Sequence, residues 1–408
     1  ELEFEQAAEY RDLIENVKRI GEKQKINDTS LGTELADTAI RFQDKQSGRD
    51  IAINYGVFSF DKPFFVLRFV FGLTDYEMGI APFDIFEWEY DPTGCGVRQQ
   101  VLNLTAQEKM AIAQAVDRNM EPQNRVYRYN FFYDNCTTRA RDIIANNLNG
   151  RIVYDSPTPQ HLNTSTPQHH NTPAQYPTFR NLIHNYNETH RWARFGNDLL
   201  LGVKADYNTT FEQQQFLPER LCADFERAYI ISADGTKRNL VSSSFWLFEP
   251  TTKQQSIQQT NMSILDVFSP LVTFSILSIL TLIIAIVEYR RKRIIWVFDT
   301  SIMLTTGACG LLLFAMIFSQ HPTVSLNLQI LLLNPINIFM LYSVTKAARQ
   351  NRIHWWTKAW SALILLLLAG SFLQSYAEGI TIVALSLLLR NISNIYTFKN
   401  TGSKQPEA

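Results

Sequence analysis

The chain has 408 residues, which is too long for one ordinary domain, and its formal net charge is -1. This near-neutral balance argues against a nucleic-acid partner, which would favour a basic surface. The four cysteines are too few for a disulfide-built scaffold, and no pair has the close spacing of a zinc site. We therefore expect two domains, no metal and no cofactor.

Residues 1–31 form a first, distinct segment. Apolar residues recur at helical spacing from Leu2 to Ile20, which predicts an amphipathic helix. The run from Glu3 to Asp12 resembles the UVR motif of excision-repair proteins, a cytoplasmic element. The chain begins with neither Met nor a signal peptide, so we expect it to be processed or incomplete, and we expect this segment to be foreign to the rest of the chain.

Residues 32–260 are polar, mixed in charge, and patterned as both strands and helices. Four segments alternate apolar and polar residues and predict strands, the first two as a β-hairpin: residues 38–44, 50–58, 84–90 and 96–104. Thr105 with Glu108 makes a capping box, which predicts a helix to about residue 119. This mixture predicts an α+β domain.

The stretch around Cys136 is the most informative part of this domain. Aromatic residues from Tyr127 predict a strand that runs into Asp134 and Asn135, good N-cap residues, and then into a helical pattern. Cys136 would lie in the first helical turn, where backbone N–H groups and the helix dipole favour thiolate over thiol. The position predicts either an activated nucleophile or an ordinary buried cysteine.

The remaining histidines and cysteines of this half have weaker interpretations. Residues 151–175 are predicted to form an irregular loop, and no carboxylate or cysteine cluster completes a metal site with its three histidines: His161, His169 and His170. His184 and His190 are expected to be solvated helix residues unless they have a function. Cys95 and Cys222 could pair in an oxidising compartment.

Residues 261–398 are predicted to form about five transmembrane helices, because five stretches approach the ~20 apolar residues that cross a bilayer: residues 267–287, 294–318, 326–344, 356–376 and 380–395. Lys and Arg cluster after the first and third stretches and in the tail of residues 399–408, whereas the other two loops have none. The positive-inside rule therefore predicts residues 32–260 outside and the C-terminus in the cytoplasm.

Polar residues within the predicted membrane half need partners or a function. Asp299, Asn334 and Asn337 should face protein or a water-filled cavity, because polar groups are costly in hydrocarbon. His321, before Pro322, lies in a short outward loop where an imidazole can titrate. A functional role and a plain loop role both remain open for His321.

Several separated motifs occur in order along the chain: Asn54-Tyr55-Gly56, Asp134-Asn135-Cys136-Thr137-Thr138-Arg139 with Asp142, the segment of residues 195–202, and His321-Pro322 followed by Asn327 and Asn334-Pro335. From about Gly32 to the C-terminus, the chain resembles the Lnb-type lipoprotein N-acyltransferases. The resemblance implies a permuted papain-like periplasmic domain, related to NlpC-type and lecithin-retinol-acyltransferase-type folds. It also implies a helical domain in the bacterial inner membrane.

The resemblance further implies a reaction and its residues. A fatty acyl chain would pass from a phospholipid to the α-amine of a diacylglyceryl-cysteine lipoprotein. Cys136 would form a thioester, and the residues expected to support it or hold the oxyanion are Asn135, Asp134, Tyr55 and Arg139. Relatives carry a Gly-His pair before the first strand, where this chain has Asp37, so His321 or His184 is expected to act as the general base.

Two other functions are kept as hypotheses. One is a membrane-tethered cysteine peptidase or amidase of the cell envelope. The other is a catalytically inactive binding module. Mass spectrometry of lipoprotein N-termini and of muropeptides would distinguish these functions from acyl transfer.

Overall fold

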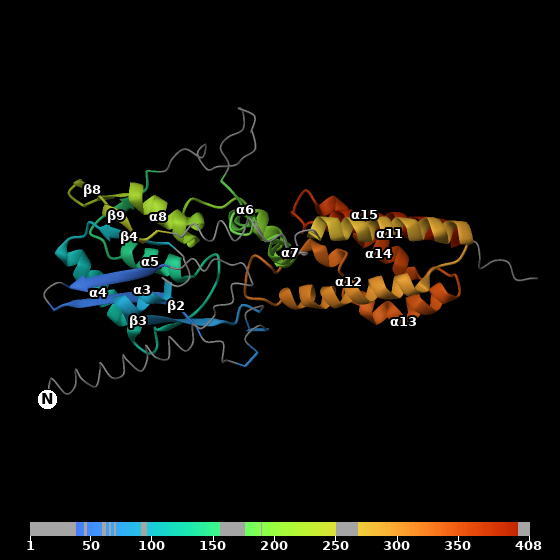
Figure 1. Cartoon of the computed structure of the whole chain (residues 1–408), viewed down its shortest axis with the longest axis horizontal. Helices are drawn as coiled ribbons and strands as arrows, with labels where there is room; N and C mark the ends of the chain where they lie inside the picture. Colours follow the sequence, from blue (N-terminus) through green and yellow to red (C-terminus); the bar gives the residue numbers. More distant parts are fainter. Residues whose placement is uncertain are drawn as a thin grey trace, which may run out of the picture. The chain divides into compact units, whose positions relative to one another are not determined.

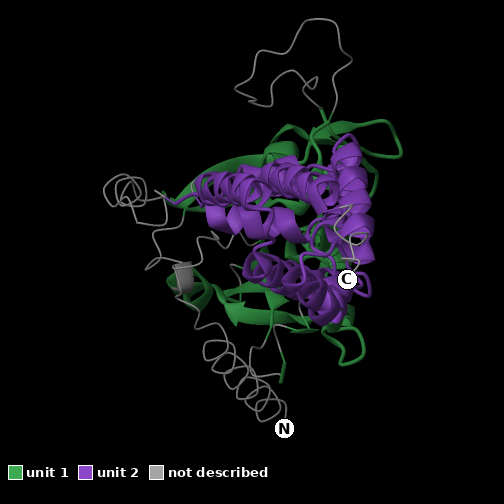
Figure 2. Ribbon diagram, turned by 90° about the vertical axis from the view of Figure 1, so that its right-hand side faces the viewer, with its two compact units in different colours: residues 1–179, 208–261 green, residues 180–207, 262–408 purple. Residues whose placement is uncertain are grey.

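The computed structural model describes these parts of the chain: residues 38–44, 47–58, 63–64, 67–68, 71–90, 96–155, 176–188, 190–249 and 268–398. Several residues interpreted above lie outside the described part of the chain: residues 1–31, over which a helix is predicted, Asp37, Cys95, His161, His169 and His170. The chain divides into two compact units (Figure 2). The first comprises residues 1–179 and 208–261, and the second comprises residues 180–207 and 262–408.

The central sheet of the first unit has four antiparallel strands in the order β1-β2-β3-β5. Its strands β2 and β3 are labelled in Figure 1. Their bounds are β1 Ala39–Asp44, β2 Arg49–Val57, β3 Asp75–Pro82 and β5 Val126–Arg128. Ala39 lies opposite Asn54 and Asp44 lies opposite Arg49, so the predicted hairpin is confirmed.

The predicted strand over residues 84–90 is wrong, because this segment is the helix α3 Phe83–Tyr90. Phe83 and Phe86 lie three residues apart and their rings contact each other, with centroids 6.1 Å apart. This spacing places both rings on one helical face, where Phe83 is buried beneath the Arg41 guanidinium, 3.5 Å from its ring centroid. β4 Val97–Leu102 pairs instead with β9 Val241–Phe248.

The capping box predicted at Thr105 is confirmed, and it begins α4 Ala106–Met120. The Thr105 N–H donates to the Glu108 carboxylate at 2.8 Å, and the Glu108 N–H donates to Thr105 Oγ1 at 3.2 Å. Glu108 is fully buried and also pairs with Arg238, which lies on a strand. The ion pair therefore joins the start of α4 to that strand. The other elements are α5 Cys136–Ala145, β6 Arg151–Val153, η5 Glu212–Phe216, α8 Pro218–Arg227, β7 Tyr229–Ile231 and β8 Lys237–Asn239.

The second unit is helical. Its described elements are α6 Phe179–His184, whose first residue belongs to the first unit, α7 Arg191–Leu200, η4 Val203–Asp206, α11 Pro270–Arg291, α12 Trp296–Met316, η6 Leu328–Leu331, α13 Ile336–Arg349, α14 Trp355–Gly370 and α15 Ile380–Phe398. Among the described residues, four segments are long and apolar enough to cross a membrane: 270–291, 296–316, 328–349 and 380–398. α14 is a shorter apolar helix of 16 residues. An α+β domain followed by a helical membrane domain is thus confirmed as the fold class.

The third apolar segment is broken between η6 and α13, at Asn334 and Pro335. Asn334 Oδ1 accepts a hydrogen bond from the Ile336 N–H at 3.0 Å, which helps to start α13. Asn337 Nδ2 donates to Thr306 Oγ1 at 2.8 Å, and Trp356 Nε1 donates to Asn337 Oδ1 at 2.8 Å. Asn337 therefore faces protein, as predicted, and joins three helices.

A buried ion triad connects α11, α12 and α15. Arg390 donates to Glu288 from Nε at 2.9 Å and to Asp299 from Nη1 at 2.7 Å. Arg390 and Glu288 are both buried, and Asn394 adds a further hydrogen bond to Glu288 at 2.9 Å. Asp299 therefore faces protein, as predicted, and its charge is paired with Arg390, which lowers the cost of a charge inside a membrane helix.

We expect Arg390→Gln to destabilise the membrane unit by about 3–5 kcal/mol, because two buried carboxylates lose their cation. The measurement is the thermal unfolding midpoint in detergent. Arg293→Gln, which changes an exposed arginine, is the control and should leave the midpoint unchanged. Adding Glu288→Gln to Arg390→Gln should recover part of the loss, and equal midpoints for all variants would contradict the structural role of the triad.

Candidate functional site

Cys136 is the first residue of α5, and Asn135 is its N-cap. Asn135 Oδ1 accepts from the Thr138 N–H at 2.9 Å, and Thr138 Oγ1 accepts from the Asn135 N–H at 2.9 Å. Asn135 Nδ2 donates to the carbonyl oxygens of Phe131 and Phe216 at 3.1 and 2.9 Å. The predicted cap is therefore confirmed, and the helix start is fixed to two other segments.

The Cys136 side chain is half-buried and packs against the hydrophobic core of the first unit. Its Sγ lies 3.9 Å from Thr137 Oγ1, and Thr137 Oγ1 lies 3.0 Å from Thr38 Oγ1, beside the start of β1. The first turn of a helix favours an anion through its N–H groups and its dipole. The position of Cys136 in the first turn is therefore one that favours a thiolate.

Tyr55, Tyr127 and Arg139 form the support beneath the start of α5. The Tyr127 hydroxyl donates to the Tyr55 carbonyl oxygen at 2.7 Å, and Asn119 Nδ2 donates to the Tyr55 hydroxyl at 3.0 Å. Burial, and less strongly the neighbouring Cys136, raises the pKa of Tyr127, so this hydroxyl stays a donor. Tyr55 is buried and acts as a core residue of the site.

Asp134 and Arg139 form a bidentate ion pair next to Cys136. Arg139 Nε and Nη2 lie 2.6 and 2.7 Å from the two Asp134 carboxylate oxygens. The Arg139 guanidinium carbon also lies 3.7 Å from the centroid of the Tyr127 ring. The pair fixes the loop before α5 to the helix itself.

The two predicted bases belong to the second unit. His184 Nε2 lies 2.8 and 3.0 Å from the Asp198 carboxylate oxygens, so its interpretation as a solvated residue is wrong. His321 is half-buried in the loop between α12 and η6, and its backbone N–H donates to Ser319 Oγ at 3.3 Å. The structure thus places Cys136 and the four predicted support residues in the first unit, and His184 and His321 in the second.

Sequence reasoning missed the carboxylate partner of His184. Asp198 is buried on α7 and also accepts from Arg180 Nη1 at 2.8 Å. Arg180 is buried as well, and its Nε donates to Asp206 at 2.8 Å. A signal was available, because Asp198 lies inside the motif of residues 195–202.

The backbone of that motif also binds side chains of η6 and the residue before it, which holds α7 and η4 against η6. Asn327 Nδ2 donates to the Leu199 carbonyl oxygen at 2.8 Å, and Gln329 Nε2 donates to the Asp198 carbonyl oxygen at 2.9 Å. At Gly202 a Cβ atom would lie 2.1 Å from the Leu326 carbonyl oxygen, so only glycine permits this approach. These motif residues thus have a structural role in placing His184 and Asp198.

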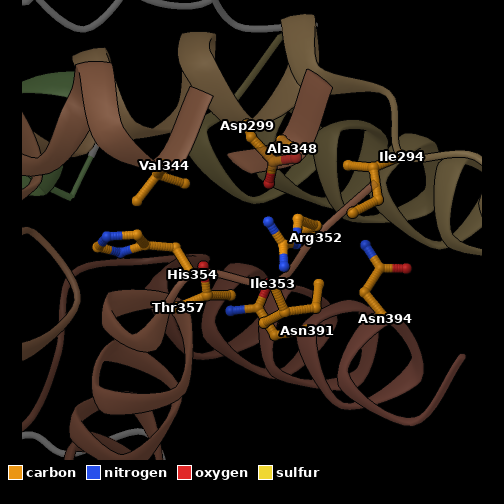
Figure 3. Close-up of a pocket in the computed structure, with 10 residues that line it drawn as sticks. All are labelled: Ile294, Asp299, Val344, Ala348, Arg352, Ile353, His354, Thr357, Asn391 and Asn394. Atoms are coloured by element: carbon orange, nitrogen blue, oxygen red, sulfur yellow. The ribbon is translucent and has the colours of Figure 1, made fainter. Parts of the chain in front are cut away.

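A small pocket in the membrane unit is a separate candidate (Figure 3). It is lined by Ile294, Asp299, Val344, Ala348, Arg352, Ile353, His354, Thr357, Asn391 and Asn394. Its volume of about 10 Å³ suits one water molecule rather than a substrate. In the described part of the chain, this pocket included, no group of three or more His, Cys, Asp or Glu could hold a metal ion.

The Asp198 network predicts an acid-sensitive part of stability. Burial alone would raise the pKa of Asp198, but hydrogen bonds from His184 and Arg180 outweigh burial and lower it below 3.8. A lowered pKa means that the carboxylate stabilises the fold above pH 3.8, and that this stability is lost as pH falls through the folded-state pKa. Asp198→Asn should therefore cost about 3–5 kcal/mol at neutral pH and much less in acid.

Thermal unfolding midpoints across the acid range provide the measurement for Asp198→Asn. Glu188→Gln, which changes an exposed carboxylate between α6 and α7, is the control and should follow the wild-type curve. A loss in Asp198→Asn that is independent of pH would contradict the ionic origin of the stabilisation.

Comparison with known proteins gives two matches to family models. Residues 30–176 match the Lnb N-terminal periplasmic domain, and residues 259–401 match the Lnb transmembrane domain. The matches occur in the order expected along the chain and together cover more than half of it. No curated protein and no solved structure matches the chain.

Proposed function

The chain belongs to the Lnb family, and on this basis we propose that it moves a fatty acyl chain from a phospholipid to the N-terminal amine of diacylglyceryl-cysteine lipoproteins. Cys136 at the capped start of α5 is the observation that carries the proposal. A thiolate is the nucleophilic form of cysteine, and a helix N-terminus stabilises it.

The reaction has two balanced steps. In the first step, the Cys136 thiolate attacks the phospholipid ester carbonyl, the S–C bond forms, and the C–O bond breaks. The protonated general base then gives its proton to the leaving oxygen of the lysophospholipid. In the second step, the lipoprotein amine attacks the thioester, the N–C bond forms, and the S–C bond breaks. The base removes the proton from the amine, and Cys136 leaves as a thiolate.

Backbone N–H groups of the first turn of α5 are the proposed oxyanion donors. The first N–H groups of any helix lack acceptors within the helix, so they point toward an incoming anion. Asn135 fixes the direction of these groups through its bonds to Thr138, and Asp134 with Arg139 fixes the loop before them. We propose that these residues are positioning residues, with Tyr55 as their support.

His184 is the leading proposed general base. A carboxylate bound to one ring nitrogen holds an imidazole in a fixed orientation, and Asp198 does this at Nε2. Nδ1 would then take and return the proton. His321 is the alternative base.

We also propose the inner-membrane topology given by the loop charges. Lys and Arg cluster at Arg290 to Arg293, around the end of α11, and at Lys346 to Lys358, from the end of α13 to the start of α14. This distribution supports a periplasmic N-terminal domain and a cytoplasmic C-terminus. Both lipid-anchored substrates would then be accessible from the outer leaflet.

Cys136→Ser is expected to abolish N-acylation of diacylated lipoproteins, because a serine hydroxyl at this position is a far weaker nucleophile. The measurement is mass spectrometry of lipoprotein N-termini from cells that have no other such activity. Cys222→Ser, which changes a half-buried cysteine on α8, should retain full activity. Unchanged N-termini with altered muropeptides in Cys136→Ser would instead support a cysteine peptidase or amidase.

Replacing each imidazole identifies the base. We expect His184→Asn to lower the N-acylation rate by about 10²–10⁴-fold, whereas His321→Asn retains activity. Asp37→His, which restores the histidine of relatives, should recover part of the rate in a His184→Asn background. Loss of activity only in His321→Asn would reverse the assignment.

A further inference from the structure

The turn immediately before Cys136 exposes two aromatic rings. Phe131 and Tyr133 retain 40% and 41% of their accessible surface. Single exposed apolar side chains are common, but two large rings within five residues of a candidate nucleophile form a local apolar surface. We call Phe131 and Tyr133 the aromatic pair.

Hydrogen bonds fix the turn that carries the aromatic pair. The N–H groups of Asn130 and Asp134 each donate to the other residue's carbonyl oxygen, at 2.8 and 2.9 Å. The Phe132 N–H donates to Asn130 Oδ1 at 3.2 Å. The Phe131 carbonyl oxygen accepts from Asn135 Nδ2 at 3.1 Å, which ties this turn to the residue next to Cys136.

Buried aromatic rings support the pair from below. The Phe131 ring packs edge-on against Phe216, with centroids 5.6 Å apart, and the Tyr133 ring packs edge-on against Phe179 at 5.4 Å. Phe132 lies between them and contacts both buried rings. The exposed rings are therefore the outer edge of an ordered cluster, and little conformational freedom is lost when a ligand covers them.

We propose that the aromatic pair binds the acyl chain that is carried on Cys136; this inference rests on the proposed function. Tyr133 is three residues from Cys136, so their Cα atoms lie within about 11 Å. An acyl chain attached to the sulfur extends farther than that, and water contact along the chain is unfavourable.

The charges around the turn favour an apolar ligand over an ionic one. Asp134 is the one ionisable carboxylate among residues 130–135, and Arg139 holds it in a bidentate pair. Within residues 130–135, the two rings therefore have no unpaired charge beside them. A saturated hydrocarbon chain fits this surface, whereas a charged peptide would gain little from it.

The test compares short and long acyl donors with the full-length protein in detergent micelles. The probes are p-nitrophenyl butyrate and p-nitrophenyl palmitate, and the readout is the rate of acylation at Cys136, followed by intact mass. The test variant is Phe131→Ser combined with Tyr133→Ser. Phe245→Ser on β9 is the matched control, because Phe245 has a similar exposure of 45%.

We expect the double variant to lower the palmitate-to-butyrate rate ratio by about tenfold and the Phe245→Ser variant to leave it unchanged. An unchanged ratio in the double variant would overturn the assignment. So would an equal loss for both donors with a lowered unfolding midpoint, because that result indicates a structural role only.

A separate readout distinguishes this inference from the proposed function. If the rate ratio changes as expected but Cys136→Ser leaves lipoprotein N-termini unchanged, the aromatic pair binds acyl chains and the proposed acceptor is wrong. If neither donor acylates Cys136 in the wild-type protein, both the acyl-chain site and the acyltransferase function are overturned.

Discussion

The side-chain hydrogen bonds of Asn135 are the interaction on which the candidate site depends. This one amide caps α5 through Thr138 and binds the carbonyl oxygens of Phe131 and Phe216. The start of the helix, the aromatic turn and the η5 segment are therefore fixed together, and Cys136 takes its position from all three. A buried amide whose groups are all bonded holds such a geometry because every alternative leaves a polar group unsatisfied.

The second unit also satisfies buried polar groups, but here the groups are charged and form ion pairs. Arg390 is buried between Glu288 and Asp299, and Arg180 is buried between Asp198 and Asp206. A low dielectric makes an unpaired ion far more costly there than at a surface, so each arginine restricts which helices can pack together. In this way Arg180 fixes α6 and α7, and with them the orientation of the His184 ring.

The sequence predicted the starts of α4 and α5 correctly, because each start depends on hydrogen bonds between residues that are close in sequence. The cap at Thr105 and the cap before Cys136 are visible in the sequence because side chain and backbone partner lie three residues apart. The strand predicted over residues 84–90 failed because Phe86 shares a helical face with Phe83, three residues earlier and just outside the predicted strand. The Asp198–His184 pair was missed because partners on separate helices have no fixed spacing in sequence.

The ion pair of Asp134 and Arg139 completes the electrostatics of the helix start. A carboxylate two residues from Cys136 would disfavour a thiolate by like-charge repulsion. Bidentate pairing with Arg139 places a positive charge against that carboxylate, at 2.6 and 2.7 Å, and so offsets its field at the sulfur. The helix dipole and the N–H groups of α5 then favour an anion at Cys136, while the turn keeps an apolar outer surface.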